Sequence, residues 1–306
     1  MTASEIEVST MRRAIVLSAH GLGRTSPNPP VGCVILDASG QVVGEGYHER
    51  KGEPHAEVHA LAAAGELSRG GTAVVTLEPC NHYGRTPPCR EALINAGVAR
   101  VVIAVMDPTS REEGGAARLR AAGVEVEVGV LADEARLVLG TWLDVLDRKR
   151  PVVTWSYRHT DGQIEPLPPE LVVLESSGVD IVVAANGHVS EALPGSHGSD
   201  VFTVPSGAPL EEPVRFLEDL YLAGARTVVL ATGTDLARPF IHGGLIDRIV
   251  VYSESSGPSQ HRDPTRQTPM LPLGFVVDEV SSQAGCIRVD ARPVNVGSPS
   301  GEAGRA

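Results

Sequence analysis

The 306-residue sequence predicts an α/β protein of two domains: an N-terminal three-layer α/β/α domain, residues 1–148, and a second α/β domain, residues 151–290. Strand and helix patterns alternate along the first half, and the length is sufficient for two domains that each bury a core. The stretch DRKRP (147–151) ends a helical pattern with basic residues and a proline, which is typical of a domain boundary.

In the first domain each element follows from the periodicity of apolar residues. Helical spacing predicts a helix over 9–20, and VGCVIL (31–36) and QVVGEGY (41–47) predict two strands joined by the turn DASG. The pattern continues as helix 55–66, strand 71–78, helix 87–96, strand 100–105, helix 111–122, strand 124–130 and helix 132–147. Strands that alternate with helices in this way favour a sheet with helices on both faces.

The second half has apolar strand patterns and weaker helix signals. The predicted strands are VVTWS (152–156), DIVVAA (180–185), RTVVLA (226–231) and RIVVY (248–252). Glycines such as Gly187 and Gly233 are interpreted as loop residues at strand ends. Residues 291–306 offer little apolar surface to bury, so we expect them to form a disordered tail.

Charge and composition limit the function classes. The net charge of −12 disfavours a nucleic-acid partner, because most of the surface would repel a phosphate backbone. No run approaches the roughly 20 apolar residues of a membrane helix, and the N-terminus lacks the apolar stretch and cleavage site of a signal peptide. We therefore expect a cytoplasmic protein that acts on a small molecule and does not bind a membrane.

Two of the four cysteines, Cys80 and Cys89, lie at the ends of PCNHYGRTPPC. A disulfide, a metal site and chance all fit this stretch by itself. In a reducing cytosol, paired cysteines are more often metal ligands or catalytic groups than structural bridges. Cys33, within VGCVIL, is interpreted as a small buried apolar residue, and Cys286 has no apparent partner in the sequence.

The triplet HAE, upstream of this loop, adds an imidazole and a carboxylate. It does not match the zinc-protease helix, in which the glutamate directly follows the first histidine. It resembles the zinc deaminases, where a His-x-Glu unit and a Pro-Cys…Cys unit supply one imidazole, two thiolates and a glutamate that is not a ligand. His55, Cys80 and Cys89 would hold about one Zn²⁺ per chain, and Glu57 would be the catalytic proton carrier. His59, one turn beyond, is expected to support the site or to pack.

Four segments resemble the deaminase domain of the bifunctional riboflavin-biosynthesis deaminase/reductase family. They are SPNPPVGCVI (26–35), GEPHAEVHAL (52–61), TLEPCNHYGRTPPC (76–89) and AGVARVVIAVMDP (96–108). The likeness covers residues 9–148 and implies a cytidine-deaminase-like fold with the same zinc ligands and proton carrier. It also implies that Asn28, His48 and Arg85 bind the substrate, a diaminopyrimidinone with a ribosylamino phosphate. The alternative interpretation of Asn28 is a turn residue before Pro29.

One loop departs from the family pattern. DPTSREEGG (107–115) replaces a DPNP start, so Thr109 stands where the resemblance places a substrate-binding asparagine. Glu112 and Glu113 bring negative charge that would weaken the binding of a phosphate. The alternative is that Ser110 and Glu113 form a capping box at the start of the next helix.

The second half resembles the family's reductase domain, which has a dihydrofolate-reductase-like fold, only in fragments. These are RPVVTWSYRHTDGQI (150–164) and GARTVVLATGTDLARPFIHGGLIDRIVVY (224–252). The family's lysine is replaced by Ser156 or a neighbour, its Glu-Gly-Gly turn reads Ala231-Thr232-Gly233, and the segment 165–187 is shortened.

From these departures we expect a zinc-dependent pyrimidine deaminase that does not use NADPH. Its degenerate second domain would support folding or a homodimer. The alternatives are a bifunctional enzyme that binds NADPH in an altered way, and a catalytically silent scaffold or binding protein.

Overall fold

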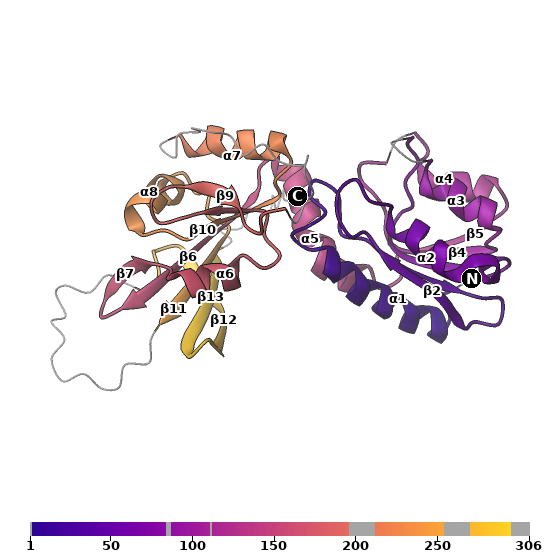
Figure 1. Ribbon diagram of the computed structural model, residues 1–306, viewed down its shortest axis with the longest axis horizontal. Helices are drawn as coiled ribbons and strands as arrows, with labels where there is room; N and C mark the ends of the chain where they lie inside the picture. The colour runs from indigo at the N-terminus through magenta and orange to yellow at the C-terminus, as the bar shows by residue number, and fades with distance from the viewer. Residues whose placement is uncertain (1, 84–86, 111, 196–211, 254–269, 295–306) are drawn as a thin grey trace, which may run out of the picture. The chain divides into compact units, whose positions relative to one another are not determined.

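The structure is a computed structural model that describes residues 2–83, 87–110, 112–195, 212–253 and 270–294 (Figure 1). Its internal contacts divide the chain into two compact units. The first consists mainly of Met1–Arg150, and the second contains most of the chain from Pro151 onward. Among the described residues no helix has the length and apolar character that a membrane crossing requires.

The first unit is built on a five-stranded sheet in the order β2-β1-β3-β4-β5. Its strands are β1 (Gly32–Leu36), β2 (Val42–Tyr47), β3 (Thr72–Leu77), β4 (Arg100–Val105) and β5 (Glu125–Val128). β1 pairs antiparallel with β2 and β3, whereas β3, β4 and β5 run parallel to one another. The parallel strands bring their carboxyl ends to one edge of the sheet, where the loops after β3 and β4 lie.

Helices cover both faces of this sheet, as predicted. They are α1 (Glu5–Ser18), α2 (Ala56–Ala64), α3 (Cys89–Ala96), α4 (Gly114–Ala121) and α5 (Ala132–Arg148). Buried residues of α2, α3 and α4 form one core cluster with the sheet, and those of α1 and α5 form another with its opposite face. The unit therefore has the three α/β/α layers that the sequence predicts.

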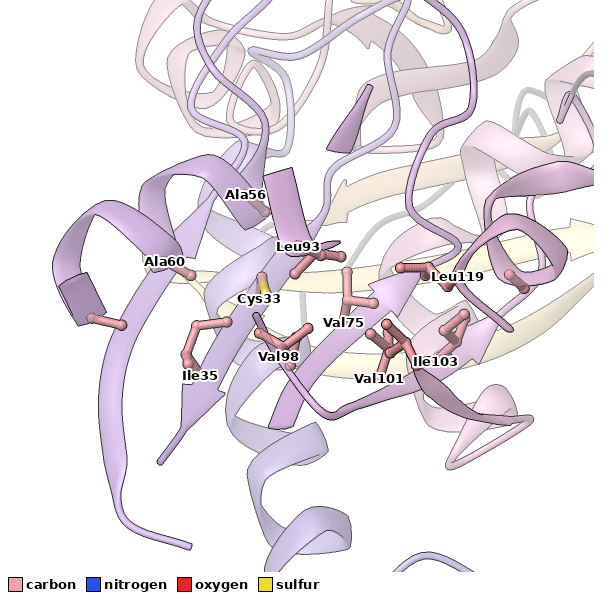
Figure 2. Close-up of a cluster of buried hydrophobic side chains, with 14 residues drawn as sticks. Cys33, Ile35, Ala56, Ala60, Val75, Leu93, Val98, Val101, Ile103 and Leu119 are labelled. Carbon is pink, nitrogen blue, oxygen red and sulfur yellow. The ribbon is translucent and has the colours of Figure 1, made fainter. Parts of the chain in front are cut away.

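Alternate strand residues supply the two cores. Cys33, Val75 and Ile103 point toward α2 and α3, where they meet Ala60 and Leu93 (Figure 2). Their strand neighbours pack on the other face against α1 and α5. Because both faces of the central strands are buried, their sequences are mostly apolar rather than alternating between apolar and polar residues. Cys33 is fully buried in this core, which confirms its interpretation as a small apolar residue.

The helices α1 and α4 begin at other residues than the sequence predicts. α1 begins at Glu5 rather than at residue 9, because Ser4 and Glu7 form a capping box. The predicted capping box of Ser110 and Glu113 is wrong: α4 begins at Gly114, and the Glu113 side chain makes no capping hydrogen bond. Glu113 instead lies 3.4 Å from Arg118 in an exposed ion pair.

The second unit contains an eight-stranded sheet in the order β12-β13-β11-β6-β10-β8-β9, with β7 paired to β6. Its strands are β6 (Val152–Thr160), β7 (Gln163–Pro166), β8 (Ile181–Val183), β9 (Val189–Glu191), β10 (Thr227–Leu230), β11 (Arg248–Ser253), β12 (Phe275–Gln283) and β13 (Cys286–Pro293). The accompanying helices are α6 (Pro169–Glu175), α7 (Pro213–Ala223) and α8 (Thr234–His242). The four strands predicted for this half correspond to β6, β8, β10 and β11, which run parallel.

The predicted start of the tail at residue 291 is wrong. β13 continues to Pro293, and Ala291 is buried opposite Ile249 of β11 and Val277 of β12. The sequence signal for this strand is weak because the charged residues Arg288, Asp290 and Arg292 alternate with its apolar ones. Residues 295–306 lie outside the described residues.

Candidate active site

Three potential metal ligands meet at the edge of the first sheet where β3 ends. His55 is the N-cap residue of α2, Cys80 lies in the loop after β3, and Cys89 is the first residue of α3. Their donor atoms all lie within 4.8 Å of one another. The fold thus gathers the three residues that the sequence predicts as ligands, because two helix N-termini converge on one strand end.

The spacing of these atoms fits a zinc ion. The Nδ1 atom of His55 lies 3.2 Å from the Sγ atom of Cys89 and 3.6 Å from the Sγ atom of Cys80. Nitrogen and sulfur ligands of a tetrahedral zinc with ordinary bond lengths are about 3.5 Å apart. A single proton on Nδ1 could not serve both sulfurs, whereas a cation among the three atoms would contact all of them.

The charges of the two thiols also fit a cation. Hydrogen bonding from Cys89, including its backbone N–H at 3.2 Å, lowers the pKa of Cys80 to about 4. The same contact, together with burial, raises the pKa of Cys89 well above its ordinary value. One thiolate therefore forms readily, and the second needs a neighbouring positive charge, which a divalent metal supplies.

Glu57 lies in the first turn of α2, next to this cluster. Only 3% of the residue is exposed, and burial raises the pKa of its carboxyl group, against the opposing influence of His55. Glu57 and two of the potential ligands, His55 and Cys80, line one cavity of about 360 Å³. This size is in the range of small-molecule sites, and a buried carboxyl with a raised pKa suits proton transfer.

Asn28 and His48 line the same cavity, whereas Arg85 lies outside the described residues. Burial lowers the pKa of His48 to about 4, so its imidazole is neutral at physiological pH. Its Nδ1 lies 3.2 Å from the carbonyl oxygen of Pro54 and must donate to it. Its Nε2 is then an acceptor for the Asn28 amide nitrogen at 3.2 Å. This contact leaves the Asn28 carbonyl oxygen available as an acceptor. The Asn28 backbone N–H also closes a turn onto Thr25, as the alternative interpretation predicts.

Several residues of the cavity wall carry no sequence signal that marks them as functional. Glu78 and Asp107 follow strands β3 and β4, and Trp142 and Leu146 come from α5. Trp142 donates a hydrogen bond from its indole to the carbonyl oxygen of Pro27, 3.1 Å away. On a helix with an apolar face, such a tryptophan is indistinguishable in sequence from a core residue.

The other residues singled out around the site have clear positions. Thr109 also lines the cavity, but its hydroxyl donates to the Asp107 carboxylate at 2.7 Å. His59 lies on α2 outside the potential ligand set, and the position where Gly46 would carry a Cβ atom is only 2.6 Å from the His59 Cβ atom. This close approach fits a packing role for His59.

Comparisons with known proteins agree with this geometry. Residues 4–105 match the family model for the cytidine and deoxycytidylate deaminase zinc-binding region. The chain is 46% identical to the riboflavin biosynthesis protein RibD of Aquifex aeolicus over 165 residues, which are 53% of this chain and 46% of that protein. It is 58% identical to RibD of Escherichia coli over 126 residues, 41% of this chain and 34% of that protein. The chain thus spans less than half the length of these curated relatives.

A solved structure resembles nearly the whole chain. It is a diaminohydroxyphosphoribosylaminopyrimidine deaminase/5-amino-6-(5-phosphoribosylamino)uracil reductase from Thermotoga maritima, with a TM-score of 0.72 and 25% identity. The alignment covers 94% of this chain and 99% of that one. The similarity in structure therefore extends over both units, whereas the curated sequence matches cover about half of the chain.

Proposed function

We propose that this chain hydrolytically deaminates a pyrimidine, because residues 4–105 match the zinc-binding region of cytidine and deoxycytidylate deaminases and the chain resembles riboflavin-biosynthesis deaminase/reductases. The proposed substrate is the riboflavin precursor, a diaminopyrimidinone with a ribosylamino phosphate, or a close relative of it. The observation that carries the proposal is the convergence of His55, Cys80 and Cys89 beside a buried Glu57 in one cavity. A catalytically silent protein would have no need of this arrangement.

The proposed reaction exchanges an amino group for an oxygen atom. Water adds to the ring carbon that bears the amine, the C–N bond breaks, and ammonia leaves, so the ring gains a carbonyl group. His55, Cys80 and Cys89 would hold zinc, which supplies a lowered water pKa at neutral pH. Glu57 would take a proton from the attacking water and return it to the leaving amine. Asn28, fixed by His48, would accept a hydrogen bond from the ring edge.

Ammonia release from a panel of aminopyrimidines tests this proposal. The panel pairs each compound with and without its ribosyl phosphate, and zinc content is measured on the same preparation. We expect steady ammonia release from the diaminopyrimidinone or a near relative, at least ten-fold faster than from cytidine. Zinc-loaded protein that releases ammonia from no member of the panel would contradict the proposal.

The second unit, in our proposal, does not reduce the deaminated product. Ser156, at or next to the position where the resemblance places the family's lysine, is fully buried, and its hydroxyl lies 3.5 Å from the Glu175 carboxylate. The turn before α8 is in contact with the chain's own side chains. The Trp155 indole donates to the Thr232 carbonyl oxygen at 2.9 Å, and the Pro166 ring lies 3.7 Å from the position of a Cβ atom on Gly233. These contacts, together with the altered residues of the turn, support the proposal that no nicotinamide cofactor is held there.

When substrate and NADPH are supplied together, we expect the deaminated product to accumulate unreduced. NADPH should also leave the fluorescence of the protein unchanged in a titration, because the family's lysine and its Glu-Gly-Gly turn have no counterpart in the resemblance. A product-dependent oxidation of NADPH at a rate comparable to ammonia release would show that both activities persist.

A homodimer formed through the second unit stays a prediction from the sequence.

A further inference from the structure

A buried carboxylate, that of Glu78, connects the loop that carries Cys80 to the opposite wall of the cavity. Glu78 directly follows β3 and is only 4% exposed. Its Oε1 atom accepts a hydrogen bond from the backbone N–H of Ala116 at 2.9 Å, and its Oε2 atom accepts one from the backbone N–H of Asp107 at 3.3 Å. One carboxylate oxygen thus holds the loop after β4, and the other holds the first turn of α4.

The start of α4 is shaped for this contact. Ala116 is the third residue of the helix, so its N–H has no acceptor within the helix. The Glu78 carboxylate supplies this acceptor from outside the helix. A Cβ atom on Gly114 would lie 2.6 Å from the Glu78 Oε1 atom, and one on Gly115 would lie 1.8 Å from the Pro79 carbonyl oxygen. Two glycines in succession therefore allow the helix to approach the residues that immediately precede Cys80.

The segment that Glu78 holds forms part of the cavity. Asp107 and Thr109 line it together with Glu78 itself, and Thr109 is tied to Asp107 by hydrogen bonds of 2.7 Å from its N–H and from its hydroxyl. The local capping box is absent, and the Glu78 carboxylate and the close approach of Gly115 to Pro79 connect this wall to the end of β3. The Glu78 backbone N–H adds a hydrogen bond of 2.9 Å to the Val105 carbonyl oxygen at the end of β4. The wall and the proposed metal-ligand loop are thereby joined at Glu78.

We propose that Glu78 is a positioning residue for the deamination proposed above: it sets the distance between the zinc-ligand loop and the substrate wall formed by Asp107 and Thr109. A charged acceptor holds two N–H groups more strongly than a neutral one does. Glutamine has the same shape but only one carbonyl oxygen, so it would turn an amide NH₂ group toward one of the two donors. The wall would then move relative to the metal ligands, and the cavity would lose its fit to the substrate.

Glu78→Gln and Glu78→Asp test this role. We expect both variants to keep zinc and to raise KM by about ten-fold, with kcat within about three-fold of the unchanged protein. The aspartate keeps the charge but is too short to reach Ala116, so its effect separates reach from charge. Hydrogen exchange should become faster at the amides of Asp107 and Ala116, a readout that does not depend on knowing the substrate.

Glu7→Gln is the matched control. Glu7 is also a buried carboxylate that accepts a backbone N–H at the start of a helix, in this case from Ser4, but it lies away from the cavity. An equal rise in KM in this control, or unchanged KM and unchanged exchange in the Glu78 variants, would overturn the proposal. If the unchanged protein deaminates no pyrimidine, the proposed function fails, and the exchange measurement alone still decides whether Glu78 holds the wall.

Discussion

Replacing Glu57 with glutamine should leave zinc and the fold in place and lower kcat by at least about 10²–10⁴-fold. Glu57 is 3% exposed and lines the cavity beside His55 and Cys80, and it is not part of the potential ligand set. A glutamine of the same size fills this space but cannot take up and return a proton. The loss should therefore appear in kcat and kcat/KM together, because the missing step belongs to the transition state.

The measurements for this variant are zinc content, thermal unfolding and ammonia release on the same preparation. Glu66→Gln is a suitable control, since Glu66 is an exposed carboxylate just beyond α2 and the variant should match the unchanged protein in all three. Near-normal turnover in Glu57→Gln would remove Glu57 from the mechanism. Loss of zinc in parallel with activity would instead assign it a role in holding the metal.

The layers of the first unit were predictable because each depends on a local pattern. Strand β1 is apolar throughout and β3 is mostly apolar, and apolar residues recur at helical spacing in the segments between strands. The order of these patterns alone indicates the α/β/α arrangement. The same order brings His55, Cys80 and Cys89 together, because a strand end and two helix starts must meet at one edge of the sheet. Residue type and topology thus both contribute to the prediction of the ligand set.

What the sequence did not reveal depends on contacts between distant segments. The capping pattern of Ser110 and Glu113 is locally plausible, but it does not form. The start of α4 is held by the Glu78 carboxylate, which directly follows β3 and accepts a hydrogen bond from the N–H of Ala116. The low pKa of His48 and the depressed pKa of Cys80 likewise arise from burial and from neighbours that the fold supplies. No spacing rule in a single sequence contains such information.

The second unit shows the same division between packing and site chemistry. Its parallel strands β6, β8, β10 and β11 were recognisable as apolar runs, because a core needs only apolar side chains in the right period. A cofactor site needs particular residues at particular turns, and the resemblance finds these altered at Ser156 or a neighbour and at Ala231 and Thr232. A fold can therefore be retained where the original chemistry is not, since different residues determine each.

Replacing Cys80 with serine should abolish zinc binding and deamination together. Hydrogen bonding from Cys89 lowers the pKa of the Cys80 thiol to about 4, whereas a serine hydroxyl stays protonated and offers zinc a much weaker ligand. We expect a drop from about one zinc per chain to near none, and ammonia release at the background rate. The melting temperature should fall as well, because zinc bound only to the folded state stabilises it.

Cys286→Ser provides the control that makes this result specific to the site. Cys286 is a partly buried free thiol in the second unit, at the start of β13, and its replacement should leave zinc content and turnover unchanged. Carefully purified protein that is active without zinc, or Cys80→Ser protein that keeps zinc and activity, would contradict the prediction. Because metal and activity are measured independently, their joint loss in one cysteine variant and joint retention in the other would connect the chemistry to the three donors at the end of β3.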